Sequence, residues 1–130
     1  MRRSVAFNPA GGLVVVRVRL WGPSGDTYVR LALDTGATTT MVRNAVLVSL
    51  GYDPTLAPRR VQMTTGSGVE FVVRLRVSRI SALGRSRRNF PVLGHTLPPS
   101  ATVDGLLGLD FFRRSRLEIN FRKGFLQLAA

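Results

Sequence analysis

Hydrophobic and polar positions alternate along most of this chain, and that pattern is typical of strands with one buried face. Residues 13–21 give the clearest example, since two sets of side chains separate onto opposite faces. These sets are Val14, Val16, Val18 and Leu20 on one face, and Val15, Arg17, Arg19 and Trp21 on the other. Turn residues follow at 22–26, and residues 27–33 form a second apolar run. The pattern predicts a β-hairpin over residues 13–33 that ends at Asp34.

Later segments repeat this pattern. Residues 59–80 read as two strands joined at a Gly-Ser-Gly tip, and residues 87–94 read as another strand. The last segment, residues 116–128, reads as a hairpin with its turn at Lys123-Gly124. Strands bounded by glycine-containing turns are typical of an antiparallel β-protein.

Helical spacing occurs in two short places. Between residues 40 and 51, apolar side chains recur at intervals of three to four positions, and Gly51 provides a stop. We expect a helix there, with the preceding threonines capping its first turn. A shorter helix is expected near Leu109–Arg114. The sequence therefore predicts one all-β domain over residues 1–130, with one or two short helices and a flexible or interface segment at residues 1–12.

The amino-acid composition excludes several kinds of active site. The 130 residues contain no cysteine and one histidine, His95, so disulfides, thiol nucleophiles and histidine-rich metal sites are excluded within one chain. We expect no metal and no cofactor. The net charge is +12, carried almost entirely by arginine. Because the arginines are scattered along the sequence, which is a weaker indication than a stripe, we do not expect nucleic acid as a partner.

No apolar run approaches the roughly 20 residues of a transmembrane helix, and the first residues lack the apolar core of a signal peptide. We expect a soluble domain with no membrane segment in this chain. Excision from a longer, membrane-anchored or periplasmic protein stays open.

The triplet Asp34-Thr35-Gly36 stands at the end of an apolar strand, where an unpaired carboxylate is costly. Thr35 adds a hydroxyl, Gly36 lets its N–H approach the carboxylate, and Ala37 permits a tight turn. Two such loops meeting at a symmetry axis would bring two carboxylates together, which then share one proton and activate a water molecule. The triplet also fits an aspartate that merely caps a turn.

A second motif, "DGLLGLDFF", lies about 70 residues further on. With both motifs in this order, the chain resembles the retroviral-like aspartic proteases, or retropepsins. It is most similar to their bacterial and cellular single-domain members and to the protease domain of eukaryotic DNA-damage-inducible proteins. The resemblance covers about residues 13 to 128 and implies a closed β-barrel of the acid protease fold.

The resemblance also implies roles for individual residues. Asp34 matches the catalytic aspartate, one from each chain of a homodimer, and Thr35, Gly36 and Ala37 match its supporting loop. The hairpin tip matches the flap that closes on a peptide substrate, with residues Thr64, Thr65, Gly66, Ser67 and Gly68. A further set matches structural support beneath the site, namely Leu106, Leu107, Gly108 and Asp110. The implied partners are a second copy of the chain and a peptide or protein substrate.

Two departures from the pattern of the viral proteases keep alternative functions open. The flap, "TTGSGVEF", is shorter and more polar at its tip than viral flaps, and the chain end "GFLQLAA" leaves open whether termini form the dimer interface. A binding module with weak or no proteolysis is therefore one alternative, and a basic nucleic-acid-binding β-domain is another. We expect Trp21 to serve in packing, and His95 lacks the sequence context of a serine hydrolase.

Overall fold

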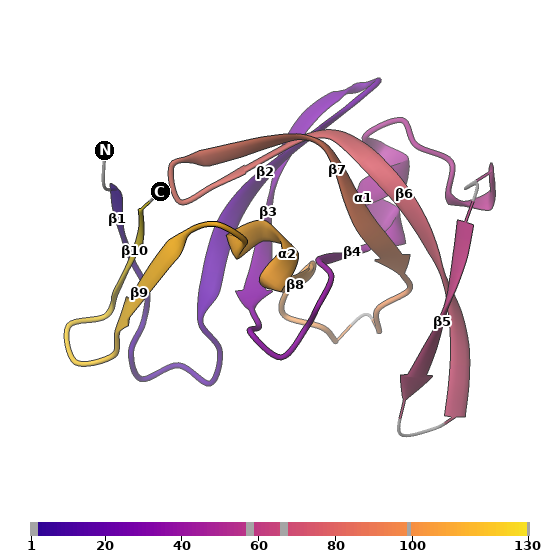
Figure 1. The fold of residues 1–130 in the computed structure, drawn as a ribbon. Coiled ribbons are helices and arrows are strands. Elements are labelled where there is room, and N and C mark those ends of the chain that lie inside the picture. The colour runs from indigo at the N-terminus through magenta and orange to yellow at the C-terminus, as the bar shows by residue number, and fades with distance from the viewer. Residues whose placement is uncertain (1–2, 57–58, 66–67, 99, 130) are drawn as a thin grey trace.

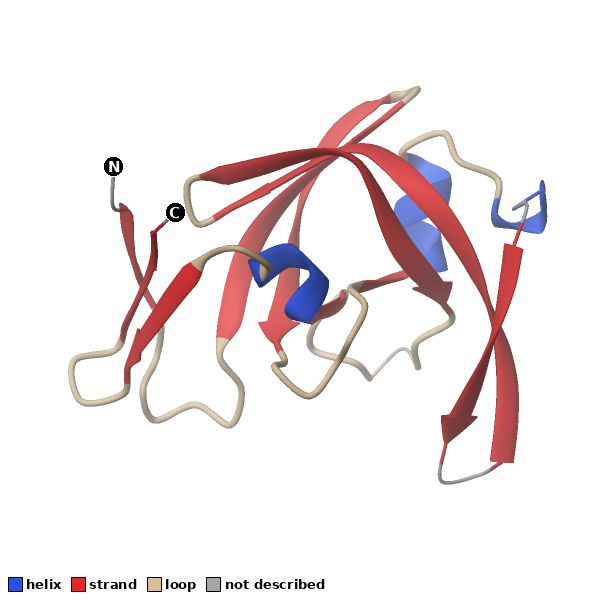
Figure 2. Cartoon of the chain, viewed as in Figure 1, coloured by secondary structure: helices blue, strands red, loops and turns tan. Residues whose placement is uncertain are grey.

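A computed structural model describes residues 3–56, 59–65, 68–98 and 100–129, and most of them lie in strands (Figures 1 and 2). The strands are β1 (Arg3–Ala6), β2 (Val15–Gly22), β3 (Gly25–Leu33), β4 (Met41–Arg43), β5 (Arg59–Thr65), β6 (Gly68–Ala82), β7 (Arg85–His95), β8 (Gly105–Leu107), β9 (Arg116–Asn120) and β10 (Phe125–Ala129). The helices are α1 (Asn44–Ser49), the 3-10 turn η1 (Pro54–Leu56) and α2 (Leu109–Phe112). The predicted all-β class with short helices is confirmed.

Six strands close into a barrel. The order β2-β3-β8-β4-β7-β6 forms one sheet, and β6 returns to pair with β2. Two of these contacts are parallel, β3 with β8 and β4 with β7, and they join segments far apart in the sequence. The predicted closed barrel is therefore present, and closure leaves few open edges on the main sheet.

The core follows from the alternation in β2. Val16, Val18 and Leu20 are at most 1 % exposed and point into the barrel, while Arg17 and Arg19 point outward. Leu31 and Phe111 complete the same core from β3 and α2. Period-two alternation on a closed sheet thus sorts the apolar residues to the inside.

A second sheet contains both ends of the described chain. Its order is β1-β10-β9, all antiparallel, and the two termini lie side by side in Figure 1. Leu126 and Leu128 of β10 pack into the barrel core, so this sheet is continuous with the main fold. Part of the predicted N-terminal segment, residues 3–6, is therefore a strand.

The predicted helix over residues 40–51 is wrong in its first turn. Residues Met41–Arg43 form β4, which pairs with β7 on one side and β8 on the other, and the helix begins only at Asn44. Hydrogen bonds to two neighbouring strands outweigh a weak local helix preference. The expected threonine cap is also wrong, because Arg43 occupies the N-cap position and makes no capping side-chain hydrogen bond.

Candidate active site

Asp34 follows β3 directly and lies half-buried at the mouth of a short loop. Its backbone N–H donates to the Leu107 carbonyl of β8 at 3.0 Å. Its Oδ1 accepts the Gly36 N–H at 2.9 Å, and its carbonyl accepts the Ala37 N–H at 3.2 Å. The bond from Gly36 orients the carboxylate, and the two backbone bonds hold the segment that carries it. Neither ion pair between described residues includes Asp34.

The loop after Asp34 is fixed at its far end by Thr40, whose side chain is fully buried. The Thr40 Oγ1 donates to Asp110 Oδ1 at 2.7 Å and accepts the Gly108 N–H at 3.1 Å. The Thr40 backbone N–H donates to both oxygens of Asp110, at 3.1 and 3.0 Å. We call these bonds the Thr40–Asp110 clasp; they satisfy a buried hydroxyl completely and join the loop to α2.

Gly108 lies against the loop at very short range. A Cβ at this position would approach the Ala37 carbonyl oxygen and the Thr39 carbonyl carbon to 2.9 Å each. The next residue, Leu109, donates its N–H to the Ala37 carbonyl at 2.8 Å. Only glycine permits this approach, because the atoms in the way are backbone rather than flexible side chain.

The two leucines before Gly108 form β8 beneath the site. Leu106 pairs with Ala32, and Leu107 pairs with Leu33 in the parallel ladder to β3. Leu107 is fully buried, whereas Leu106 is half-buried. The structure thus brings Asp34, Gly36, Ala37, Leu107, Gly108 and Asp110 into one network, although they are separated by up to 76 residues (110 − 34) in the sequence.

Two arginines that the sequence analysis did not assign to the site stabilise its framework. Arg87 of β7 donates from Nε to the Phe111 carbonyl at 3.0 Å and from its terminal nitrogen to the Arg113 carbonyl at 2.6 Å. These bonds satisfy carbonyls at the end of α2. Burial, together with the nearby Arg85 and Arg114, lowers the pKa of Arg87 from its ordinary value.

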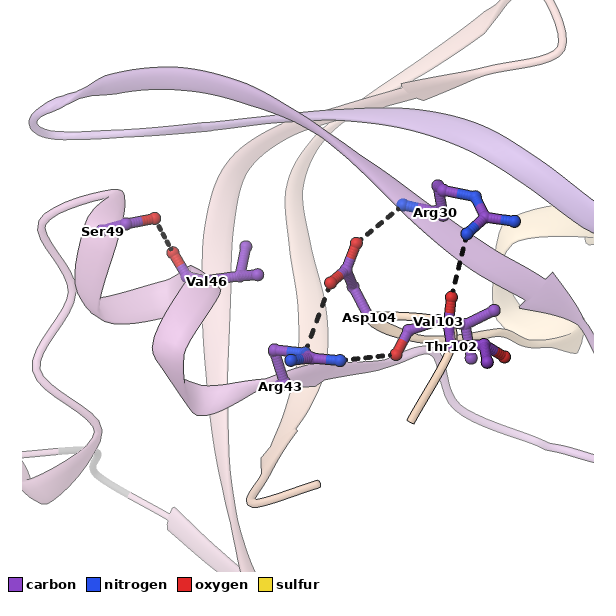
Figure 3. Close-up of polar contacts among 7 residues, drawn as sticks. All are labelled: Arg30, Arg43, Val46, Ser49, Thr102, Val103 and Asp104. Carbon is purple, nitrogen blue, oxygen red and sulfur yellow. Dashed lines mark hydrogen bonds and ion pairs between the residues drawn. The ribbon is translucent and has the colours of Figure 1, made fainter. Parts of the chain in front are cut away.

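The second arginine, Arg43, helps to hold the segment that leads into β8 (Figure 3). Asp104 lies between two elements: its Oδ2 accepts the Arg30 backbone N–H at 2.9 Å, and its Oδ1 lies 3.3 Å from Arg43 Nε. Arg43 also donates to the Val103 carbonyl at 2.8 Å, and Arg30 donates to the Thr102 carbonyl at 3.0 Å. Asp104 is therefore engaged in holding β3, β4 and the start of β8 together.

The flap residues predicted from the sequence belong to the β5–β6 hairpin, which extends beyond the barrel in Figure 1. Thr64 and Thr65 lie in β5 and pair with Val69 and Gly68 of β6. Gly66 and Ser67 lie outside the described residues.

The four other aspartates of the chain are each engaged elsewhere in the fold. Asp26 pairs with Arg19, Asp53 accepts the Thr55 N–H, and Asp104 and Asp110 are engaged as above. Among the residues that the structure describes, no three or more histidine, cysteine or acidic residues gather in a way that could hold a metal ion. A helix long and apolar enough to cross a membrane is likewise not found in the described ranges.

Comparison with known proteins agrees with this geometry. A retropepsin-like aspartic protease from Rickettsia conorii has a similar fold, with a TM-score of 0.74 over 98 % of this chain and 89 % of that chain, at 19 % sequence identity. No curated protein sequence matches. The family described as aspartyl protease matches residues 16–111, which include both Asp34 and Gly108. The chain therefore belongs to the aspartyl protease family and has the retropepsin-like fold.

Proposed function

We propose that this protein is an aspartic endopeptidase that acts as a homodimer, with Asp34 of each chain forming the catalytic dyad. The observation that carries the proposal is the fixed position of Asp34, between β8 and a loop that the Thr40–Asp110 clasp holds in place. A rigid carboxylate at the mouth of a loop fits a catalytic group better than a residue that only caps a turn.

The engagement of the four other aspartates supports a second chain as the source of the second carboxylate. An aspartic protease uses two carboxylates a few ångströms apart, which cannot both ionise. Each of Asp26, Asp53, Asp104 and Asp110 is bound elsewhere in the fold. Thr35 and Gly36 are exposed in the single chain, which leaves the Asp34 loop accessible to the same loop of a partner.

In the proposed mechanism the dyad shares one proton. The ionised carboxylate takes a proton from a water molecule, and the neutral carboxylic acid hydrogen-bonds the carbonyl oxygen of the substrate. The Gly36 N–H on Asp34 Oδ1 orients the carboxylate for this exchange. Thr35, Gly36 and Ala37 organise the loop, and Leu106, Leu107, Gly108 and Asp110 support it from below.

The β5–β6 hairpin supplies the flap in this proposal. Residues 64–68 would close over an extended peptide, exclude water and hydrogen-bond the peptide backbone. Residues 1–130 then act as one protease domain, and the substrate is a peptide or protein.

The test is cleavage of a mixed peptide library, followed by mass spectrometry from acidic to neutral pH. We expect Asp34→Asn to abolish cleavage while the thermal unfolding midpoint stays near that of the wild type. The matched control is Asp53→Asn, which replaces an exposed aspartate in a turn and should cleave like the wild type. An active Asp34→Asn variant would contradict the mechanism. No cleavage by folded, dimeric wild type would favour the peptide-binding module instead.

A further inference from the structure

The outer face of β2, β3 and β6 carries a cluster that the catalytic proposal does not use. Its members are Arg17, Arg19, Trp21, Tyr28 and Arg79, which we call the arginine–aromatic face. On β2 its residues alternate with the buried Val18 and Leu20, so they point away from the core. Strand pairing gathers the rest, because residues directly opposite each other share a face.

The register defines this face. Arg19 is opposite Tyr28 on one side and Ser81 on the other, and Trp21 is opposite Arg79. The same ladders extend the row of cations, since Arg17 is opposite Arg30 and Arg79 is opposite Arg88. Arginines that are scattered in the sequence therefore form a basic stripe across β3, β2, β6 and β7. Scatter along the sequence therefore does not exclude a stripe in the folded chain.

The guanidinium groups stack on the two aromatic rings. Arg17 lies 3.9 Å and Arg19 5.3 Å from the centre of the Tyr28 ring. Arg19 and Arg79 lie 4.6 and 4.5 Å from the centre of the Trp21 ring. Stacking orders a guanidinium group while its N–H edge stays able to bind a planar anion in a bidentate manner.

The cations of this face outnumber its anions. Asp26, which lies opposite Trp21 and so on the same face, pairs with Arg19 at 2.6 Å, and neither described ion pair includes Arg17 or Arg79. A groove of about 500 Å³ runs along the cluster, with Ser81 and Leu83 also among its lining residues. Its lining residues come from β1, β2, β3 and the β6–β7 hairpin, and Figure 1 shows that this hairpin crosses over β2. A concave surface with excess positive charge concentrates anions.

We propose that the arginine–aromatic face binds single-stranded nucleic acid through its phosphate backbone and through base stacking on Tyr28. Tyr28 is 51 % exposed, so part of its ring is accessible to a base. Arginines beside aromatic side chains on a positively charged groove are the usual means of binding single strands without sequence preference. The net charge of +12 strengthens this attraction at long range.

Strand pairing argues against an extended acidic peptide in the same groove. Such a peptide usually adds to an open sheet edge through backbone hydrogen bonds. Here β2 is paired with β3 along its whole length and with β6 at Arg19–Trp21, so the part of the groove at Trp21 and Arg79 has both edges of β2 closed to a further strand. That part of the face therefore offers side chains and not backbone hydrogen-bonding groups, and arginine side chains can bind phosphates.

The proposed binding site is separate from Asp34. Tyr28 and Asp34 are six positions apart along and just beyond β3 (34 − 28), which is about 20 Å of extended chain. Bound nucleic acid would therefore leave the peptidase site open, and this inference does not depend on the proposed function.

The test measures fluorescence anisotropy of labelled oligothymidine with the wild type and with Arg17→Gln/Arg79→Gln, over a range of salt concentrations. Each phosphate contact on a single strand contributes about 0.7 to the slope of log affinity against log salt. We expect the double variant to lower that slope by about 1.4 and Tyr28→Ala to weaken binding by about tenfold. The matched control is Arg113→Gln/Arg122→Gln, which removes the same charge from exposed residues outside the groove and should keep the wild-type slope.

Three outcomes would overturn the proposal. If the wild type does not bind oligothymidine, the protein lacks the proposed nucleic-acid-binding activity. If the groove variant and the control lose the same amount of salt slope while both keep wild-type unfolding midpoints, binding depends on overall charge and not on this face. Tighter binding of polyglutamate than of oligothymidine assigns the face to acidic protein segments.

Discussion

The Asp34 region and the arginine–aromatic face use polar groups in opposite ways. Around Asp34, polar atoms of the Thr40–Asp110 clasp are paired with a specific partner inside the protein, and Thr40 is fully buried. On the outer face, Arg17, Arg19 and Arg79 are matched by Asp26 alone within the cluster and are held by stacking on rings. A buried network of this kind fixes one geometry, whereas an exposed cluster of like charges remains able to bind something else.

This contrast predicts where single substitutions should matter. Removing one atom from the clasp leaves a buried group without a partner, which is costly. Removing one charge from the outer face lowers its total positive charge only in part, because several arginines contribute to it. The following predictions test the difference, from the largest expected effect to the smallest.

The largest effect is expected for Thr40→Val, which keeps the shape of the side chain and removes its hydroxyl. Asp110 loses the 2.7 Å bond and the Gly108 N–H loses its acceptor. We expect the free energy of unfolding to fall by about 3 kcal/mol, since a bond to a charged group and a buried donor are both affected. Peptide cleavage should fall as well.

Urea unfolding checks this prediction. The control is Thr38→Val, an exposed position in the same loop, which should change the free energy of unfolding by less than about 0.5 kcal/mol. Equal stability of the two variants would mean that the clasp does not hold the loop.

A smaller loss is expected for Gly108→Ala. The new methyl group would meet the backbone of Ala37 and Thr39 at 2.9 Å, so the loop that carries Asp34 must move. We expect a loss of about 1–3 kcal/mol, the usual cost of overpacking a close contact. Gly12→Ala is the control, because nothing lies within 4 Å of a Cβ there. A stable, fully active Gly108→Ala variant would show that the loop tolerates displacement.

The smallest effect is expected on the outer face. Asp26→Asn removes the one acidic partner within that cluster, a pair in which both side chains are more than one-third exposed. We expect no measurable change in the unfolding midpoint and a rise in oligothymidine affinity of less than about fivefold. A large drop in the unfolding midpoint would show that this pair is structural, and the contrast between the two regions would fail.

The sequence predicted the elements better than their arrangement. The hairpin over residues 13–33 and the short helix near Leu109 were predicted correctly, because alternation and helical spacing are local properties. The helix predicted from residue 40 was wrong at Met41–Arg43, where pairing with β7 and β8 decides the conformation. Local preference is too weak to resist hydrogen bonds from two sides.

The site residues likewise divide into those that the sequence indicates and those that only the fold reveals. Asp34-Thr35-Gly36 and Leu106-Leu107-Gly108 are short motifs that the sequence displays directly. Thr40 gives no comparable signal, because its partner Asp110 lies 70 residues away. Its place before an apolar run predicts a helix cap instead. Arg87 was likewise missed, since its bonds reach carbonyls of α2 that only the folded chain brings near.

By itself, the sequence determined the β class, the positions of the longer hairpin strands and their turns, the position of the Asp-Thr-Gly loop and the overall positive charge. Each depends on residues close together in the chain. The tertiary structure alone decided the closure of the barrel, the clasp beneath Asp34 and the gathering of arginines on one face. Those features depend on the register between distant strands, which is set when the whole core packs and not by any single segment.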